Sequence, residues 1–191
     1  MADLLGMDPD RIERLRSPER LTYFDPSRIW EVLDPAPDFT LIDIGTGVGF
    51  VALPFADRYP AATIYGCDIL DGMIGLLKED AATKRLANLE GIIMQPNSID
   101  LPNDTADVIV MAQLHHELDT PEPLLAECKR LLGAGGIVAV IHWNDEENGR
   151  SPAAGRRVPE LTIREQLEAA GFSDPESHDV YEFHTFLTGK A

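Results

Sequence analysis

Short continuous apolar runs alternate along the chain with stretches in which apolar residues recur at helical spacing. A short apolar run between turn residues is typical of a buried strand, and an i, i+3, i+4 recurrence is typical of an amphipathic helix. The predicted strands are 39–44, 62–67, 91–95, 106–112 and 136–142. The predicted helices between them are 50–59, 70–81 and 124–132. This alternation predicts an α/β fold: a Rossmann-like, doubly wound, mostly parallel sheet with helices on both faces.

Two residues refine the predicted helices. Pro54 lies inside 50–59, and because proline is tolerated in the first turn of a helix, we expect the helix to begin close to it or to kink there. Gly133 follows 124–132 and is expected to adopt the left-handed conformation that ends many helices.

The chain before the first strand is charged and carries two helix-start signals. Residues 1–16 lack a clear apolar face, and we expect a mobile or helical arm. Ser17-Pro18 and Asp25-Pro26 each place a proline directly after a capping residue. The helix that Asp25-Pro26 opens is expected to end before Pro35.

The carboxyl-terminal part departs from the alternation. Residues 143–160 are polar, with glycine, proline and three arginines, and are predicted to form the longest loop. Residues 162–165 read as a capping box, which would open a helix that ends at Gly171. The strand-like runs 177–181 and 183–187 predict an antiparallel C-terminal edge hairpin.

The formal net charge of −17 at pH 7 bears on the partners. Nucleic-acid binding relies on neutralising phosphates, so this charge disfavours a nucleic-acid partner. No apolar run approaches a membrane span, and the first residues lack the apolar centre of a signal peptide, so we expect a cytoplasmic protein. Cys67 and Cys128 lie in apolar-periodic segments and are expected to be buried free thiols. The sequence leaves open whether the protein forms a homodimer.

A glycine-rich turn follows the first predicted strand. Ligands of open parallel sheets bind beyond the carboxyl ends of the strands. Gly45, Gly47 and Gly49 would let the backbone turn sharply there and approach a ligand closely. Asp68 ends the second strand about 20 residues on, where such folds hold ribose hydroxyls. The pattern therefore predicts a nucleoside-containing ligand.

The details of this turn disfavour a dinucleotide. A dinucleotide-binding loop reads Gly-x-Gly-x-x-Gly, whereas here the third glycine falls one place early, at Gly49. Asp43, directly before the turn, would repel a pyrophosphate. S-adenosylmethionine carries an ammonium, a sulfonium and a ribose but no phosphate, so the local charge favours it.

The turn at 43–49 resembles motif I of the class I S-adenosylmethionine-dependent methyltransferases. Further segments that are similar to the family's motifs are 66–70, 96–102, 107–110, 113–116 and 131–136. The resemblance runs from about Phe39 to His142. It is strongest to the small-molecule branch that includes the ubiquinone and menaquinone biosynthesis methyltransferases.

The resemblance implies an activity and a cofactor site. The activity is in-line transfer of a methyl group from S-adenosylmethionine to a small-molecule acceptor, which releases S-adenosylhomocysteine. Asp43 and the turn would hold the methionine end, Asp68 the ribose, and Asn97 with Ser98 the adenine. The implied cofactor-binding residues are Asp43, Gly45, Thr46, Gly47, Gly49, Asp68, Ile69, Met73, Asn97, Ser98, Gln113 and Leu114.

We predict one methyltransferase domain over residues 1–191, a length sufficient for a single hydrophobic core. Within it, 1–37 would form an N-terminal helical arm or lid and 38–142 the cofactor-binding core. Residues 143–191 would supply the acceptor-side loop, the last helix and the terminal strands.

Histidines follow two of the predicted strands. Either His115 or His116 could act as a general base for the acceptor, and the alternative is that both are loop residues that pack or cap. Adjacent histidines lack the His-Glu-x-x-His spacing, so we predict no metal site. His142 could line the acceptor pocket or face solvent at the end of its strand.

Other classes of function are alternatives to methyl transfer. A non-catalytic S-adenosylmethionine-binding module or a partner-binding protein would share the motifs without transferring a methyl group. A short-chain dehydrogenase is disfavoured because no tyrosine is followed four residues later by lysine.

Overall fold

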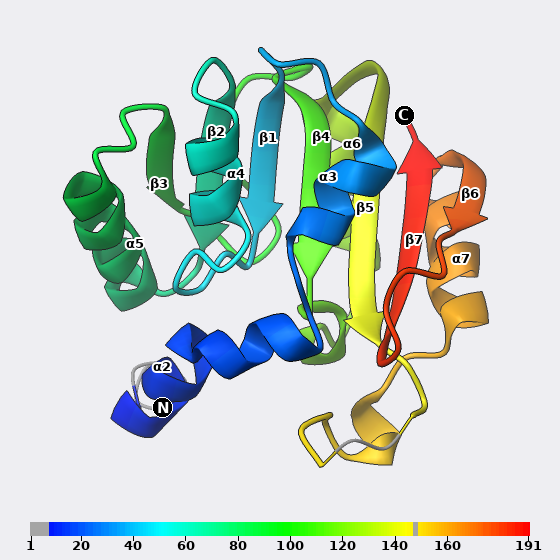
Figure 1. The fold of residues 1–191 in the computed structure, drawn as a ribbon. Helices are drawn as coiled ribbons and strands as arrows, with labels where there is room; N and C mark the ends of the chain where they lie inside the picture. Colours follow the sequence, from blue (N-terminus) through cyan, green and yellow to red (C-terminus); the bar gives the residue numbers. More distant parts are fainter. Residues whose placement is uncertain (1–7, 147–148) are drawn as a thin grey trace. The chain divides into compact units, whose positions relative to one another are not determined.

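The structure, a computed structural model, describes residues 8–146 and 149–191 (Figure 1). Contacts divide the chain into two compact units, 1–99 and 100–191, and each is described by itself. The first seven residues of the expected N-terminal arm lie outside the described residues. In the described part of the chain, no helix is both long and apolar enough to cross a membrane.

The first unit begins with short helices. Helix α2 spans Pro9–Arg16, as expected for a helical arm, and α3 spans Ser27–Leu33 and ends before Pro35, as predicted. Between them, Pro18–Thr22 form the 3-10 helix η1. Ser17 caps η1 through its side-chain oxygen, so the predicted start is confirmed although the turn is tighter than an α-helix.

The strands of the first unit are β1 (Thr40–Ile44), β2 (Thr63–Asp68) and β3 (Leu89–Ile93). They are parallel and lie in the order β3-β2-β1. The prediction for β3 was two residues late, because Leu89 already pairs with Ile64. Beyond β3, Gln95 instead bridges to Ser98 in a tight turn.

Helices α4 (Ala52–Arg58) and α5 (Asp71–Lys84) pack on these strands. Pro54 lies in the first turn of α4, where no backbone hydrogen bond is lost, as predicted. Helix α3 joins them through an aromatic cluster, in which the Trp30 ring meets Phe55 edge-on with 5.2 Å between centroids. This packing anchors the helix that follows the glycine turn.

The second unit contains strands that are parallel and antiparallel. Its elements are β4 (Ala106–Ala112), the 3-10 helix η2 (His115–Glu117), α6 (Glu122–Leu131), β5 (Leu132–Trp143), η3 (Ala154–Arg156), α7 (Glu160–Ala169), β6 (Ser173–Ser177) and β7 (His184–Lys190). The strand order is β4-β5-β7-β6. β4 and β5 are parallel, and β7 is antiparallel to both of its neighbours (Figure 1). The predicted α/β class, mostly parallel with an antiparallel C-terminal hairpin, is confirmed.

Three local predictions for this unit were wrong. Gly133 does not end α6, because the chain passes directly into β5 at Leu132 and the left-handed residue is Gly135, with φ 80°. The capping box at 162–165 does not open α7, which already begins at Glu160. The first strand of the hairpin precedes 177–181, because Gly171 takes a positive φ of 86° and turns the chain at once into β6.

Candidate functional site

The glycine turn joins β1 to α4 in the first unit. Gly45, Gly47 and Gly49 all adopt positive φ, at 72°, 53° and 79°. The backbone nitrogens of Gly45 and Thr46 both donate to the carbonyl oxygen of Cys67, at 2.8 and 3.0 Å. The turn is therefore tied to the carboxyl end of β2, as the predicted ligand position requires.

Gly47 and Gly49 differ in what surrounds them. A Cβ on Gly47 would meet nothing within 4 Å, whereas a Cβ on Gly49 would lie 2.4 Å from the Cδ1 atom of Leu77. Gly49 therefore permits close packing of the turn against α5, and Gly47 borders open space. An unfilled space beside a glycine in such a turn is a cradle for a ligand.

Asp43, in β1, holds the turn through its side chain. Its carboxylate is 2% exposed and accepts from the Thr46 hydroxyl at 2.7 Å and from the Ala52 backbone nitrogen at 3.1 Å. Both bonds reach Oδ2, so Oδ1 remains able to accept from a further donor. Burial raises the pKa of Asp43 to about 7, against the opposing effect of these hydrogen bonds.

Asp68 connects β2 to the turn. Its Oδ2 accepts from the Gly47 backbone nitrogen and its Oδ1 from the Leu70 backbone nitrogen, each at 2.9 Å. A carboxylate oxygen has more than one acceptor position, so both oxygens can still accept hydroxyl groups. These acceptor positions lie beside Gly47 and can take hydroxyl donors, so Asp68 stays the predicted ribose-binding residue.

The remaining predicted residues of this unit differ in accessibility. Ile69 is 55% exposed, so its side chain is accessible to a ligand at the carboxyl end of β2. Asn97 and Ser98 are exposed on the turn that Gln95 closes. Met73 is only 2% exposed and belongs to the core beneath α5, so any contact with a ligand would be limited.

Arg20 is a residue of this region that sequence reasoning missed. Its guanidinium lies over the Phe50 ring, 3.9 Å from the centroid, and its Nη1 donates to the Leu15 carbonyl oxygen at 2.8 Å. Burial lowers the pKa of Arg20, and the charges of Tyr23 and Asp43 oppose this. Nothing in the charged N-terminal segment distinguishes Arg20 from its neighbours, because its burial depends on Phe50.

A cavity of about 530 Å³ lies beside the turn. It is bordered by the N-terminal helices, the Val48–Phe50 part of the turn, and α4 and α5. Arg16 and Asp80 border it and form an ion pair at 2.7 Å. Asp68 and Asn97 are not among its lining residues, so it is distinct from the ribose and adenine positions predicted above.

In the second unit, Gln113 follows β4 in a left-handed conformation. Its φ is 56°, a sparsely populated value for a residue with a side chain. Its backbone nitrogen donates to the Ile141 carbonyl oxygen at 2.7 Å, and its side-chain Nε2 lies 2.8 Å from Nε2 of His184. Leu114 is half-buried. The exit of β4 is thus held to β5 and to the start of β7.

The structure distinguishes the two histidines that the sequence could not. His115 is 2% exposed, and its Nε2 lies 2.8 Å from the amide oxygen of Gln166 in α7. His116 is half-buried, with Nε2 at 3.4 Å from the Glu117 carboxylate. Burial lowers the pKa of His115, which favours the neutral imidazole that a general base requires.

His142 does not face solvent, so that alternative was wrong. Its side chain is fully buried, and its Nε2 accepts from the Val158 backbone nitrogen at 3.2 Å. Burial, reinforced by His116, His115 and His184, lowers its pKa to about 3. Val158, in the loop between β5 and α7, thus lies against the end of β5, a contact that no local sequence pattern predicts. Residues 147 and 148 of the predicted 143–160 loop lie outside the described residues.

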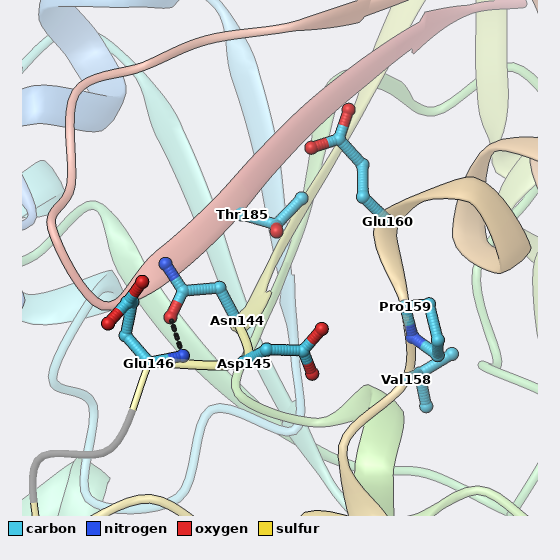
Figure 2. A pocket seen from close by; sticks show the side chains of 7 residues that line it. All are labelled: Asn144, Asp145, Glu146, Val158, Pro159, Glu160 and Thr185. Atoms are coloured by element: carbon cyan, nitrogen blue, oxygen red, sulfur yellow. Dashed lines mark hydrogen bonds between the residues drawn. The ribbon is translucent and has the colours of Figure 1, made fainter.

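The same loop borders a cavity of about 290 Å³ (Figure 2). Its lining residues come from the segment after β5, the approach to α7 and its first residue, and β7: Asn144, Asp145, Glu146, Val158, Pro159, Glu160 and Thr185. The Asn144 side-chain oxygen accepts from the Glu146 backbone nitrogen at 3.0 Å. Among the residues that the structure describes, no group of histidine, cysteine or acidic side chains is arranged to hold a metal ion.

The parallel strands, the glycine turn and the acid that ends β2 define a Rossmann-like cofactor-binding protein. The chain belongs to the class I S-adenosylmethionine-dependent methyltransferases: the family described as "Methyltransferase domain" matches residues 42–140, just over half of the chain. S-adenosyl-L-methionine is the cofactor of this family, so the predicted family and its cofactor are confirmed.

Individual proteins that resemble this chain are methyltransferases as well. A crystal structure of an S-adenosylmethionine-dependent methyltransferase from Aquifex aeolicus superimposes with a TM-score of 0.90 and 29% identity, covering 96% of this chain and 98% of that one. A malonyl-[acyl-carrier protein] O-methyltransferase from Geobacter sulfurreducens is 28% identical over 81% of this chain and 62% of its own length. A demethylmenaquinone methyltransferase from Chlamydia muridarum is 30% identical over 53% of this chain and 43% of its own length. The chain spans about half the length of the curated relatives it matches.

Proposed function

We propose that this protein transfers a methyl group from S-adenosylmethionine to a small-molecule acceptor. The observation that carries the proposal is the bond between Asp68 and the Gly47 backbone nitrogen beside the open space at Gly47. When bound, S-adenosylmethionine supplies a methyl group on a sulfonium, which leaves readily. The protein therefore needs mainly to bind, to orient and to exclude water.

Residues of the first unit would each hold one part of the cofactor. Asp68 accepts hydrogen bonds from the ribose hydroxyls, and the exposed face of Ile69 supports the adenine. Asn97 and Ser98 stand on an exposed turn where they can bond the adenine edge. These roles require no change in the hydrogen bonds that hold the turn, because the carboxylate oxygens of Asp68 can each accept again.

The methionine end of the cofactor carries an ammonium and a carboxylate. Asp43 and Arg20 bear opposite charges and interact electrostatically within this unit. We assign the ammonium to the turn and to the field of Asp43, and the carboxylate to Arg20. A zwitterion would thereby stabilise both buried charges, which each lose hydration in the folded protein.

The acceptor would be a small molecule bound by residues of the second unit. The relatives include a malonyl-[acyl-carrier protein] O-methyltransferase and a demethylmenaquinone methyltransferase. Their names indicate different acceptors, so neither acceptor is assigned to this protein. His115 is the favoured base, because its buried, neutral imidazole is oriented by Gln166, whereas His116 is bonded to an exposed carboxylate.

Calorimetric titration with S-adenosylmethionine and S-adenosylhomocysteine tests the cofactor. We expect both to bind, and Asp68→Ala to weaken both by about a hundredfold, from loss of two or more hydrogen bonds to a charged group. Absence of binding by folded protein would contradict the proposal. Binding without formation of S-adenosylhomocysteine across a broad acceptor panel would instead favour a non-catalytic binding module.

A further inference from the structure

Three imidazole rings gather where β4 and β5 end in the second unit. The ring centroids of His115 and His142 lie 6.0 Å apart, and those of His116 and His142 lie 5.4 Å apart. Among the described residues, neither these rings nor any other group of histidine, cysteine or acidic side chains is arranged to hold a metal ion. The cluster therefore needs an explanation in terms of hydrogen bonds and protons.

Hydrogen bonds fix opposite tautomers on two of these rings. His115 Nε2 lies 2.8 Å from the Gln166 amide oxygen, which can only accept, so Nε2 carries the proton and Nδ1 presents a lone pair. His142 Nε2 accepts from the Val158 backbone nitrogen, so in the neutral ring the proton is on Nδ1. One ring thus offers an acceptor at Nδ1 and its neighbour offers a donor.

Both Nδ1 atoms are buried and have no hydrogen-bond partner among the described residues. Leaving a buried polar atom unsatisfied costs about 1–3 kcal/mol. Such atoms are rare in native proteins, and each calls for a role. A complementary donor and acceptor on adjacent rings are what one hydroxyl group would satisfy.

We propose that His115 Nδ1 and His142 Nδ1–H together bind the hydroxyl group of the acceptor, a phenol or an enol, so that the protein is an O-methyltransferase. This inference rests on the proposed methyl transfer. The oxygen forms the bond to the methyl carbon while the carbon–sulfur bond breaks, its electron pair going to sulfur. The hydroxyl proton moves to His115 Nδ1. Gln166 is a positioning residue, because it holds the proton on Nε2 of His115.

The lone pairs of the acceptor atom explain the choice of oxygen. A hydroxyl oxygen has two lone pairs, so one can accept from His142 Nδ1–H while the other attacks. A neutral amine has a single lone pair, which that donor would occupy. A thiol is a weak acceptor, and a carbon nucleophile offers no matching pair of groups.

The charges around the pair favour proton transfer to His115 over His142. The carboxylate of Glu122 acts on His115 and favours its protonated form. His142 faces His115, His116 and His184, and each of these raises the cost of charging it. His142 therefore stays neutral as a donor while His115 takes the proton.

His116 is the most exposed of the three rings. Its side chain is 12% exposed and interacts with Glu117, which is 43% exposed. His115 is 2% exposed and His142 is fully buried. The proposal therefore requires the acceptor hydroxyl to enter the cluster on the side of His116.

Nitrogen NMR of the histidine rings tests the proposal without the cofactor. In the free protein we expect a proton on Nε2 of His115 and on Nδ1 of His142; the reverse tautomer on either ring overturns it. Adding 2-naphthol should shift both Nδ1 resonances, 2-naphthylamine should shift them several-fold less, and naphthalene should not shift them. Equal shifts from the amine, or none from 2-naphthol, also overturn it.

Variants of Gln166 test whether this residue positions the His115 ring or only stabilises the fold. The preference for 2-naphthol is the ratio of the Nδ1 shifts that 2-naphthol and 2-naphthylamine cause. Gln166→Glu keeps an acceptor for Nε2–H and should retain this preference, whereas Gln166→Met should reduce it by about tenfold. His178→Gln, which alters a ring bonded instead to Thr188, should leave it unchanged. If both Gln166 variants keep the wild-type preference, Gln166 has a structural role only. Calorimetry with S-adenosylmethionine independently reports on the proposed methyl donor, so failure of either proposal is distinguishable.

Discussion

The Asp68 carboxylate accepts a hydrogen bond from the Gly47 backbone nitrogen at 2.9 Å, so the last residue of β2 holds the turn after β1. The same carboxylate accepts from Leu70 at the approach to α5. One side chain thus fixes the position of the turn, and it is the group proposed to bind the ribose. Its structural and functional roles can be separated by substitution.

Asp68→Asn should bind S-adenosylhomocysteine at least about tenfold more weakly while the protein remains folded. The amide keeps one acceptor oxygen for the backbone but loses the charge and one acceptor, and bonds to charged groups contribute about 1.5–3 kcal/mol. Calorimetry measures the affinity and urea unfolding the stability. Unchanged affinity would contradict the ribose role.

Gly47→Ala and Gly49→Ala should have contrasting effects. At Gly47 the added methyl group enters open space, so stability falls by about 1 kcal/mol from the positive φ, while cofactor affinity falls at least about tenfold. At Gly49 it meets Leu77 at 2.4 Å, so stability falls by about 2–4 kcal/mol. Thermal unfolding with and without S-adenosylhomocysteine measures both. Equal effects of the two substitutions would refute the assignment of Gly47 to the ligand.

Cofactor affinity should rise with pH through the titration of Asp43. The pKa of Asp43 in the free protein is raised to about 7, and a bound ammonium would lower it. The complex then binds fewer protons than the free protein, so affinity rises by up to about tenfold per pH unit below pH 7 and levels off above it. Calorimetry in buffers of different ionisation enthalpy should detect proton release near pH 7. In Asp43→Asn both effects should disappear.

His142 should make the folded state sensitive to acid. Its pKa is about 3 when folded and near 6.5 when unfolded, so the unfolded chain binds more protons between these values. The contribution is fully present above pH 6.5 and is lost as the pH falls, by up to about 1.4 kcal/mol per pH unit. Urea unfolding from pH 7 to pH 5 should therefore show a smaller loss for His142→Asn than for wild type. Parallel pH profiles would count against a buried neutral ring.

Acidification should stabilise the folded state through Asp43, the opposite of its effect through His142. Its folded pKa lies above the unfolded value of 3.8, so the folded state binds more protons between pH 3.8 and pH 7. Stability from this group therefore falls as the pH rises through that window. The unfolding free energy of Asp43→Asn relative to wild type should increase from pH 5 to pH 8. A constant difference would contradict the raised pKa.

Much of the first unit could be predicted from the sequence because its signals are local. The glycines at 45, 47 and 49 adopt the positive φ that only glycine takes easily, and Asp68 ends a strand marked by an apolar run. The predictions based on Gly133 and on the capping box at 162–165 were wrong because local signals do not act alone. Each is a signal that a neighbouring element overrides, β5 in one case and an earlier helix start in the other.

The sequence by itself determined the alternation of strands and helices, the glycine turn and the acid that ends β2, and with them the methyltransferase family. Only the tertiary structure decided which histidine is oriented and how. His115 meets Gln166 from 51 residues away, and His142 meets the Val158 backbone from 16 residues away. Tautomers depend on such partners, which packing brings together, and no local pattern encodes them.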